Sequence, residues 1–312
     1  MANRLDYRKF QDVFGAGDNL PYDQHINRDI ESKRKSLGGV LFVDRVFGAL
    51  GVTKVKLYPP RDGRMLHELY QQILHSKMTV HHKLSALYYL LLDHDEGMSP
   101  RSKISENFAA QTGMPKRYQI FMSGLWHMDR LQFKVALEYL GHPSLLPEFA
   151  DNIITVLVRH AENNDYSLPL AYYYTVQPVL KTPEALELLF GAIARTDVTE
   201  ALYFTRKLPA PARQQLFEQL VVSVLKDTGG HLDAASRAAE LVSLPLHSDE
   251  EAWLRAFLAA GEGRKLKKAK DTLLMRKIVC GDVGLGEGKS PSGPWGVVLQ
   301  GFRHAPGSHA RQ

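Results

Sequence analysis

The chain has 312 residues, of which 44% are hydrophobic and 23% are charged, a balance typical of a folded globular protein. This length corresponds to one large domain or two smaller ones. A single cysteine, Cys280, excludes an internal disulfide and the paired thiolates of a zinc finger. The charged first residues and the absence of a long apolar run predict neither secretion nor membrane insertion.

The positive charge is concentrated at the end of the chain. The formal net charge is +5, but residues 261–312 carry 10 Lys or Arg against 4 Asp or Glu, whereas residues 1–260 carry 29 against 30. A surface that binds nucleic acid through its phosphates needs an excess of cations. We therefore expect that any contact with nucleic acid is made by the C-terminal part.

Apolar residues recur at helical spacing along most of the chain. They predict helices over 80–91, 118–126, 133–140, 186–193 and 216–225. Frequent prolines between these stretches predict short helices, and short connections favour antiparallel neighbours.

Several residues indicate where helices begin and end. Thr182 precedes Pro183, which predicts a helix that starts with a capping hydroxyl and a proline in its first turn. Asp197 and Ser248 each precede a glutamate by three residues, an arrangement typical of capping boxes. The glycines expected to end helices at positive φ are Gly51, Gly113 and Gly141.

These signals predict an all-α fold, an irregular solenoid-like stack of short antiparallel helices with a disordered C-terminal tail. The stretch 52–58 alternates like a strand, but it has no partner strand and is interpreted as an extended connector. We predict an α-helical domain over 1–260, a basic helix over 261–280 and a Gly-rich flexible tail over 281–312, which holds 8 of the 24 glycines.

No catalytic motif is complete. The run 284–290 is similar to a phosphate-binding loop, but Val283 stands where the first glycine is needed and prolines follow where a helix should begin. No two histidines lie three or four residues apart, so no helix presents a metal-binding pair. Asp93, Asp95 and Glu96, at a predicted helix end, are interpreted as solvated charges. We expect no enzymatic activity, cofactor, metal or small-molecule substrate.

Two surface segments are candidates for binding. The first is the patch Tyr22, Asp23, Arg28 and Asp29, where polar groups adjoin an aromatic ring; helix capping and ordinary surface charge are the alternative interpretation. The second is the basic segment 264–277, which could bind nucleic acid or an acidic partner, or form a solvated helix face. Its leading cations are Arg264, Lys265, Lys267, Lys268 and Lys270.

Longer strings carry a family resemblance over about residues 20–258. They run in order through Leu20-Pro21-Tyr22-Asp23, Arg28, Lys35-Ser36-Leu37, Gly124-Leu125-Trp126, Asp129, Phe133, Pro143-Ser144-Leu145, Leu170-Ala171-Tyr172-Tyr173, Val198-Thr199-Glu200-Ala201, Ala239-Glu240-Leu241-Val242, Leu244-Pro245 and Trp253. In their order and spacing the chain resembles the ELYS-like domain of fungal nuclear pore proteins.

This resemblance implies an α-helical scaffold in the nucleus, at the nuclear envelope, within the Y-shaped outer-ring complex of the nuclear pore. It implies docking near the short arm onto a large propeller-plus-solenoid nucleoporin, with a small WD40-propeller nucleoporin adjacent. It also implies a role in pore assembly and in the transport of protein and mRNA. Two other hypotheses remain: a chromatin or nucleic-acid binder acting through 264–277, and an all-α enzyme with a pocket of ionisable groups.

Overall fold

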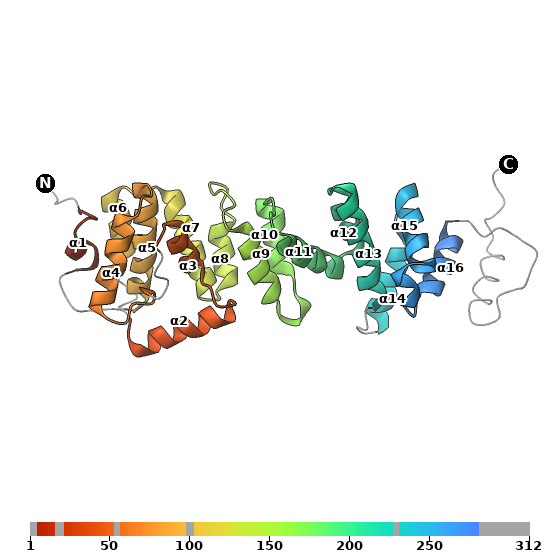
Figure 1. The fold of residues 1–312 in the computed structure, drawn as a ribbon, viewed down its shortest axis with the longest axis horizontal. Helices are drawn as coiled ribbons and strands as arrows, with labels where there is room; N and C mark the ends of the chain where they lie inside the picture. Colours follow the sequence, from red (N-terminus) through yellow and green to blue (C-terminus); the bar gives the residue numbers. More distant parts are fainter. Residues whose placement is uncertain (1–4, 16–21, 53–56, 98–102, 227–230, 281–312) are drawn as a thin grey trace, which may run out of the picture. The chain divides into compact units, whose positions relative to one another are not determined.

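The computed structural model describes residues 5–15, 22–52, 57–97, 103–226 and 231–280, and side chains are described in all of these except 231–233. Within these ranges the regular elements are all helical, which confirms the predicted all-α class (Figure 1). The predicted tail 281–312 and the glycine-rich run 284–290 lie outside the described residues. Among the described helices, none combines the length and apolar composition that a membrane crossing requires.

The chain divides into two compact units, Met1–Ala201 and Leu202–Gln312, with the boundary inside one helix. The first unit contains α1 (Phe10–Phe14), α2 (Gln24–Ser36), α3 (Phe42–Ala49), α4 (Gly63–His75), α5 (Val80–Gly97), α6 (Ile104–Thr112), α7 (Lys116–Asp129), α8 (Phe133–Leu140), α9 (Ala150–Arg159), α10 (Ser167–Val176) and α11 (Pro183–Thr196). The boundary lies in α12 (Val198–Arg206). The domain limits expected from the sequence stay a prediction.

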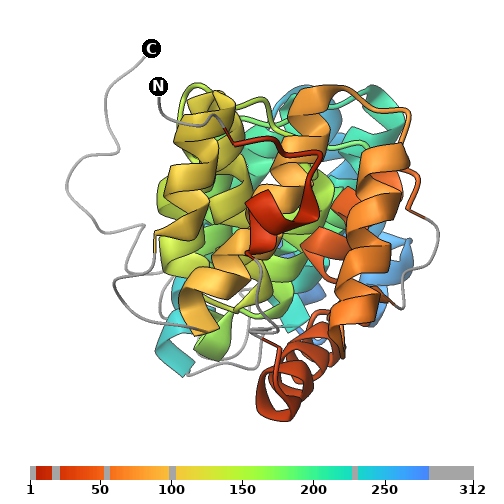
Figure 2. The ribbon, with the colours of Figure 1, turned by 90° about the vertical axis from the view of Figure 1, so that its left-hand side faces the viewer.

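Helices of the first unit pack mainly on their neighbours in sequence. The closest association joins α7 to α8, and α5 packs on α4, α6 and α7. Gly124 permits the approach of α7 to α8, because a Cβ there would lie 2.7 Å from the Leu140 side chain. Figure 2 looks onto the N-terminal end, where α1 lies in front and α2 runs along the lower edge.

The second unit contains α13 (Ala210–Lys226), α14 (His231–Ser243), α15 (Ser248–Ala259), the 3-10 helix η3 (Glu262–Lys265) and α16 (Ala269–Val279). α13 packs on α14 and α15, and α16 packs on the same two helices. Leu220 and Val224 of α13 and Leu254 of α15 are fully buried and form part of its core.

The five helices predicted from periodicity are confirmed as parts of α5, α7, α8, α11 and α13. Thr182 caps α11, because its hydroxyl accepts from the Ala185 amide at 3.4 Å, and Asp197 accepts from the Glu200 amide at 2.6 Å.

Two predicted helix ends are wrong in detail. The start of α15 is capped one residue earlier than expected: the Glu250 carboxylate accepts from the His247 amide at 2.9 Å, so the carboxylate that closes the turn is Glu250 and not Glu251. Gly141 has φ −81°, so it ends α8 without entering the left-handed region, whereas Gly51 and Gly113 do have positive φ.

Candidate protein-interaction surfaces

A buried carboxylate, Asp93, forms a hub inside the first unit. It accepts hydrogen bonds from the hydroxyls of Tyr22 (2.8 Å) and Tyr58 (2.9 Å), from Trp126 Nε1 (2.8 Å) and from Arg130 Nη2 (2.7 Å). We name these five residues the Asp93 hub. Burial raises the pKa of the Tyr22 and Tyr58 hydroxyls, with a further contribution from the charge of Asp93, so both remain donors. The hub fixes the start of α2 against α5 and α7.

The interpretation as solvated charge is therefore wrong for Asp93 and Asp95, whereas Glu96 is about half exposed. Asp93 is almost fully buried, and Glu96 forms an ion pair with Arg130 at 2.7 Å. Asp95 accepts from the amides of Ile104 and Ser105, at 2.8 and 3.1 Å, and from the Ser105 hydroxyl at 2.5 Å. Asp95 thereby supplies acceptors to the first turn of α6, whose preceding residue gives no side-chain cap.

A second buried carboxylate, Asp129, anchors the start of α3. It accepts from the amides of Phe42 (2.6 Å) and Val43 (2.9 Å) and from the Tyr89 hydroxyl (2.7 Å). Burial raises the pKa of Asp129 to about 7, although these three hydrogen bonds favour the charged form. Sequence reasoning missed this role, because residues 42 and 129 are joined only by the tertiary fold.

The four residues of the predicted α2 patch have different environments. Tyr22 is buried in the Asp93 hub. Asp23 is the N-cap of α2 and accepts from the Ile26 amide at 2.7 Å, while Asp29 pairs with Lys33 at 2.6 Å. Arg28 is exposed and lines a broad cleft of about 1000 Å³ together with Tyr22 and other residues of α2 and of the 58–61 segment. The structure thus leaves Arg28 and Asp23 available at the surface.

Arg34 holds the far end of α2 to the unit. Its guanidinium forms hydrogen bonds to both carboxylate oxygens of Asp44, at 3.0 and 2.9 Å, and to the Tyr58 carbonyl at 2.9 Å. It also pairs with Glu31. Bidentate contacts of this kind fix direction as well as distance. α2 is therefore secured near both of its ends while its outer face stays exposed.

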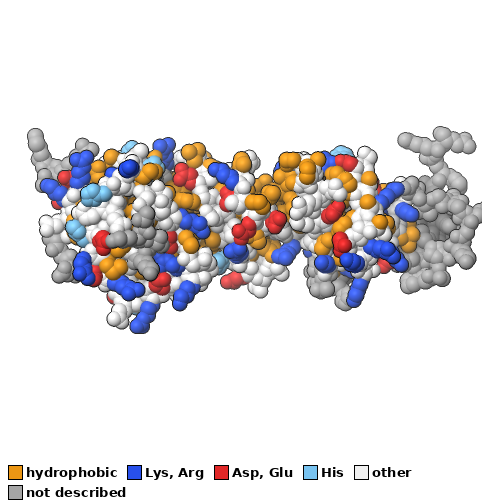
Figure 3. Space-filling view, viewed as in Figure 1, with side chains coloured by type: hydrophobic (Ala, Val, Ile, Leu, Met, Phe, Trp, Pro, Cys, Tyr) orange, Lys and Arg blue, Asp and Glu red, His pale blue; other side chains and the backbone are white. Residues whose placement is uncertain are grey.

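The predicted basic segment is divided between two elements of the second unit. Arg264 and Lys265 belong to η3, and Lys270 to α16; the cations Arg264, Lys265, Lys267 and Lys270 are exposed and Lys268 is half-buried. Figure 3 shows Lys and Arg side chains on the surface of the described residues, interspersed with acidic and hydrophobic side chains. Lys265 pairs with Glu262 at 2.8 Å. The surface is basic, but its cations do not lie on one continuous helix face.

Arg276, inside the same segment, is an internal residue. Its guanidinium donates to the carbonyls of Val242 (2.6 Å) and Leu244 (2.7 Å) and pairs with Glu251 at 2.5 Å. Arg276 therefore holds α16 against the end of α14 and the start of α15, and it is not available to an external ligand.

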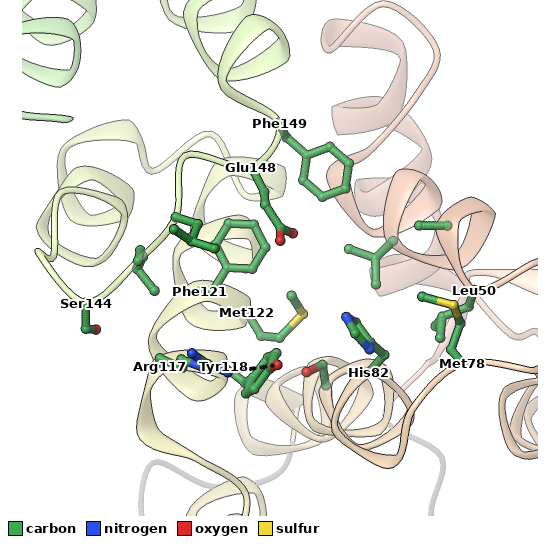
Figure 4. A pocket seen from close by; sticks show the side chains of 15 residues that line it. Leu50, Met78, His82, Arg117, Tyr118, Phe121, Met122, Ser144, Glu148 and Phe149 are labelled. Carbon is green, nitrogen blue, oxygen red and sulfur yellow. Dashed lines mark hydrogen bonds between the residues drawn. The ribbon is translucent and has the colours of Figure 1, made fainter. Parts of the chain in front are cut away.

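An apolar hollow of about 160 Å³, which the sequence analysis missed, opens on the surface of the first unit (Figure 4). Its walls come from α3, α5, α7 and the 142–149 loop. Phe121 and Met122 line one side, Leu50 and Met78 the other, and Phe149 closes the top of the view. The sequence signal that could have indicated it is the pair of leucines, 145 and 146, in a proline-flanked loop.

The buried polar groups of these arrangements are engaged in holding helices together. In the described residues, no group of three His, Cys, Asp or Glu side chains could hold a metal ion. The buried carboxylates Asp93 and Asp129 accept from donors of the same unit. The features open to a ligand are the α2 cleft, the exposed cations of 264–270 and the apolar hollow.

Comparison with known proteins agrees with this description. Residues 40–261 match the family model ELYS, described as nuclear pore complex assembly. The chain is also 28% identical, over 248 residues, to the uncharacterized protein ely5 of Schizosaccharomyces pombe, covering 78% of this chain and 77% of that protein. Since the model spans most of the described helices of both units, the chain belongs to the ELYS family of nuclear pore complex assembly proteins.

Proposed function

We propose that this protein is a structural scaffold nucleoporin that docks onto the outer-ring Y-complex of the nuclear pore and supports pore assembly and transport. The observation that carries the proposal is the family match over 40–261, since that family is associated with the nuclear pore and its assembly. The proposed partners are the large propeller-plus-solenoid nucleoporin of the short arm and the small WD40-propeller nucleoporin beside it.

The arrangement of polar groups supports a binding role without catalysis. Asp93, Asp129 and Arg130 are buried and hydrogen-bonded. Arg130 pairs with Asp93 of α5, and Asp129 of α7 accepts from the Phe42 amide at the start of α3, so these groups hold helices together. The exposed face seen in Figure 3, by contrast, carries interspersed apolar and charged side chains, a composition that suits contacts with protein partners. α2, with Arg28 and Asp23 at its surface, is one proposed contact area.

Affinity purification tests this proposal. The tagged full chain, extracted under mild salt, is expected to recover the outer-ring nucleoporins in near-equal amounts, and a fluorescent fusion is expected at the nuclear rim. Recovery of the chain without any outer-ring nucleoporin, together with diffuse nuclear fluorescence, would contradict it.

The exposed cations of 264–270 support a second candidate function, binding to nucleic acid. Four of them are exposed with few acidic neighbours in the described part of the segment. The chain's affinity for duplex DNA should then fall steeply with salt concentration. Replacing Lys267, Lys268 and Lys270 with Gln should abolish that affinity, while outer-ring recovery should stay intact. Salt-independent or absent DNA binding would remove this candidate.

A further inference from the structure

The rim of the apolar hollow exposes large hydrophobic side chains to solvent. Leu146 is 73% exposed and Met78 is 37% exposed, and both line the hollow. Isolated exposed leucines are common on protein surfaces, but apolar groups that surround an apolar depression form a continuous patch. Such patches on otherwise polar surfaces mark sites where another protein docks.

The loop that forms one wall is held in an unusual backbone conformation. Phe149 has φ +56° and ψ +21°, a left-handed conformation that is a clear outlier for a bulky residue. Its ring lies 6.2 Å from that of Phe121, with the two ring planes only 7° apart. Strained residues persist where the surrounding packing determines them, and they are concentrated at functional sites. The wall of the hollow is therefore built in advance of any ligand.

A second cavity lies behind the same loop. Its volume is about 270 Å³, and it shares Phe121, Leu145 and Leu146 with the hollow. The 142–149 loop thus has space on two sides.

Charges of opposite sign flank the hollow. The Arg117 guanidinium lies over the Tyr118 ring, 4.9 Å from its centroid, and Glu148 projects from the loop on another side (Figure 4). Both residues are exposed, and within the described part of the chain neither forms an ion pair. An occupant would therefore meet a cation at one side of the hollow and a carboxylate at another, which sets the charges that the occupant should carry.

We propose that the hollow is a socket for one bulky apolar side chain on an amphipathic helix of an outer-ring nucleoporin. In that helix an acidic residue would face Arg117 and a basic residue would face Glu148. This inference rests on the proposed function. The volume supports a single anchor, because a cavity of about 150 Å³ accommodates a group the size of benzene. One apolar anchor in a pocket with a polar rim is the usual form of a binding hot spot, and helices dock in apolar grooves in this way.

Binding of the purified full chain to the purified, reassembled outer-ring complex tests the socket. Leu146→Glu places a charge at its rim and should weaken the dissociation constant at least tenfold, about the loss expected at a hot spot. Arg117→Glu should weaken it about threefold to tenfold, with most of the loss in the association rate and dependent on salt. The matched control is Val179→Glu, at a loop residue of the same unit that is 80% exposed and does not line the hollow.

Each outcome decides the inference. All three substituted residues are exposed, so unchanged thermal unfolding should show that the variants fold. If the wild type binds and Leu146→Glu binds as tightly as Val179→Glu, the socket is wrong while the proposed function stands. If the wild type does not bind the complex, both are wrong. If Leu146→Glu alters only self-association in sedimentation experiments, the occupant is a second copy and this proposal is also overturned.

Discussion

The two units each contain networks of buried charge, but these networks join different numbers of segments. In the first unit the centre of the network is a carboxylate, Asp93, which gathers donors from residues as distant as Tyr22 and Arg130. The second unit also holds a buried carboxylate, Glu250, which accepts from Arg206, but α16 is held by an arginine: Arg276 donates to the carbonyl groups at the end of α14 and pairs with Glu251. The first network joins several segments at once, whereas the second fastens one helix, α16, to its two neighbours.

This difference determines how many polar groups lose a hydrogen-bond partner when the central residue of each network is removed. Removing Asp93 leaves two tyrosine hydroxyls and one indole N–H without this acceptor, and it leaves Arg130 with one carboxylate, Glu96, instead of two. Removing Arg276 leaves two buried carbonyl groups without this donor, but each is a single uncharged acceptor. Buried charges are costly to isolate but are not in themselves a source of stability, so the expected effect depends on what remains unpaired.

Breaking the first network should have the largest effect. Asp93→Ala removes the acceptor of two tyrosine hydroxyls and the Trp126 indole, and it leaves Arg130 with Glu96 as its remaining carboxylate. We expect a loss of about 3–5 kcal/mol in the free energy of unfolding, the range for removing one partner of a buried ion pair. Urea unfolding measures it, and hydrogen exchange should show the amides of α2 losing protection first.

Glu96→Gln is the control for that variant. It neutralises the other carboxylate that pairs with Arg130, but Glu96 is about half exposed. Its loss should be within about 1 kcal/mol. Equal effects of the two substitutions would mean that Arg130, and not the Asp93 hub, carries the stability of this region.

In the second unit, the substitution that disrupts the corresponding network is Arg276→Met. It retains much of the buried apolar stem but removes the donors to Val242 and Leu244 and the pair with Glu251. We expect a loss of about 2–3 kcal/mol, confined to α16 and the adjoining ends of α14 and α15. Hydrogen exchange by mass spectrometry should locate it there. Lys277→Met, at the exposed neighbour, should change nothing measurable, and a loss of protection in the first unit would contradict the independence of the two networks.

The sequence predicted the helices better than it predicted these networks. Apolar periodicity over 118–126 and 216–225 reports a buried face directly, so α7 and α13 were predicted correctly. Asp93 was misinterpreted because a carboxylate near a helix end is usually solvated, and its donors come from positions 22, 58, 126 and 130. No local sequence pattern indicates that donors from such distant positions meet at one carboxylate.

The candidate surfaces were foreseen to different degrees. The exposed cations are Arg28, Arg264, Lys265, Lys267 and Lys270, and Lys268 is half-buried, which agrees with the tendency of charged side chains to stay in water. Tyr22 and Arg276 are buried, since each has a partner that only the fold brings near. The apolar hollow was missed because it is formed by separate helices and a loop. Family membership, in contrast, could be predicted from short sequence motifs in a fixed order, because recognising them does not require knowing which residues are in contact.

The pH dependence of stability offers a finer test of the carboxylate network. Because the folded pKa of Asp129 is about 7 and an unfolded Asp titrates near 3.9, the folded chain binds one more proton between these values. This group therefore favours folding at low pH, and its contribution declines as the pH rises from about 4 to about 7. Asp129→Asn removes that dependence, so the stability difference, wild type minus variant, should fall by about 1.4 kcal/mol for each pH unit within this window.

Urea unfolding at pH 4.5, 6 and 7.5 measures this difference.

Glu250, a buried carboxylate of the second unit, provides a contrast, because its pKa is lowered whereas that of Asp129 is raised. Burial would raise the pKa of Glu250, but hydrogen bonds from Arg206 and the His247 amide outweigh it and hold the pKa below its ordinary value. The stability contributed by Glu250 is therefore lost only when the pH falls below its unfolded pKa. A difference between wild type and Asp129→Asn that does not vary with pH would show that Asp129 is charged throughout.

The smallest expected effect separates structure from binding within the α2 patch. Tyr22→Phe removes one buried hydroxyl and its hydrogen bond to Asp93, so we expect a loss of about 1 kcal/mol, seen as faster hydrogen exchange in α2. Arg28→Ala, at an exposed residue of the cleft, should leave stability within about 0.5 kcal/mol and weaken binding to the outer-ring complex. The opposite result, with Tyr22→Phe weakening binding at unchanged stability, would mean that the tyrosine leaves the Asp93 hub to meet the partner. α2 would then be a mobile contact element and not a helix held in place by the first network.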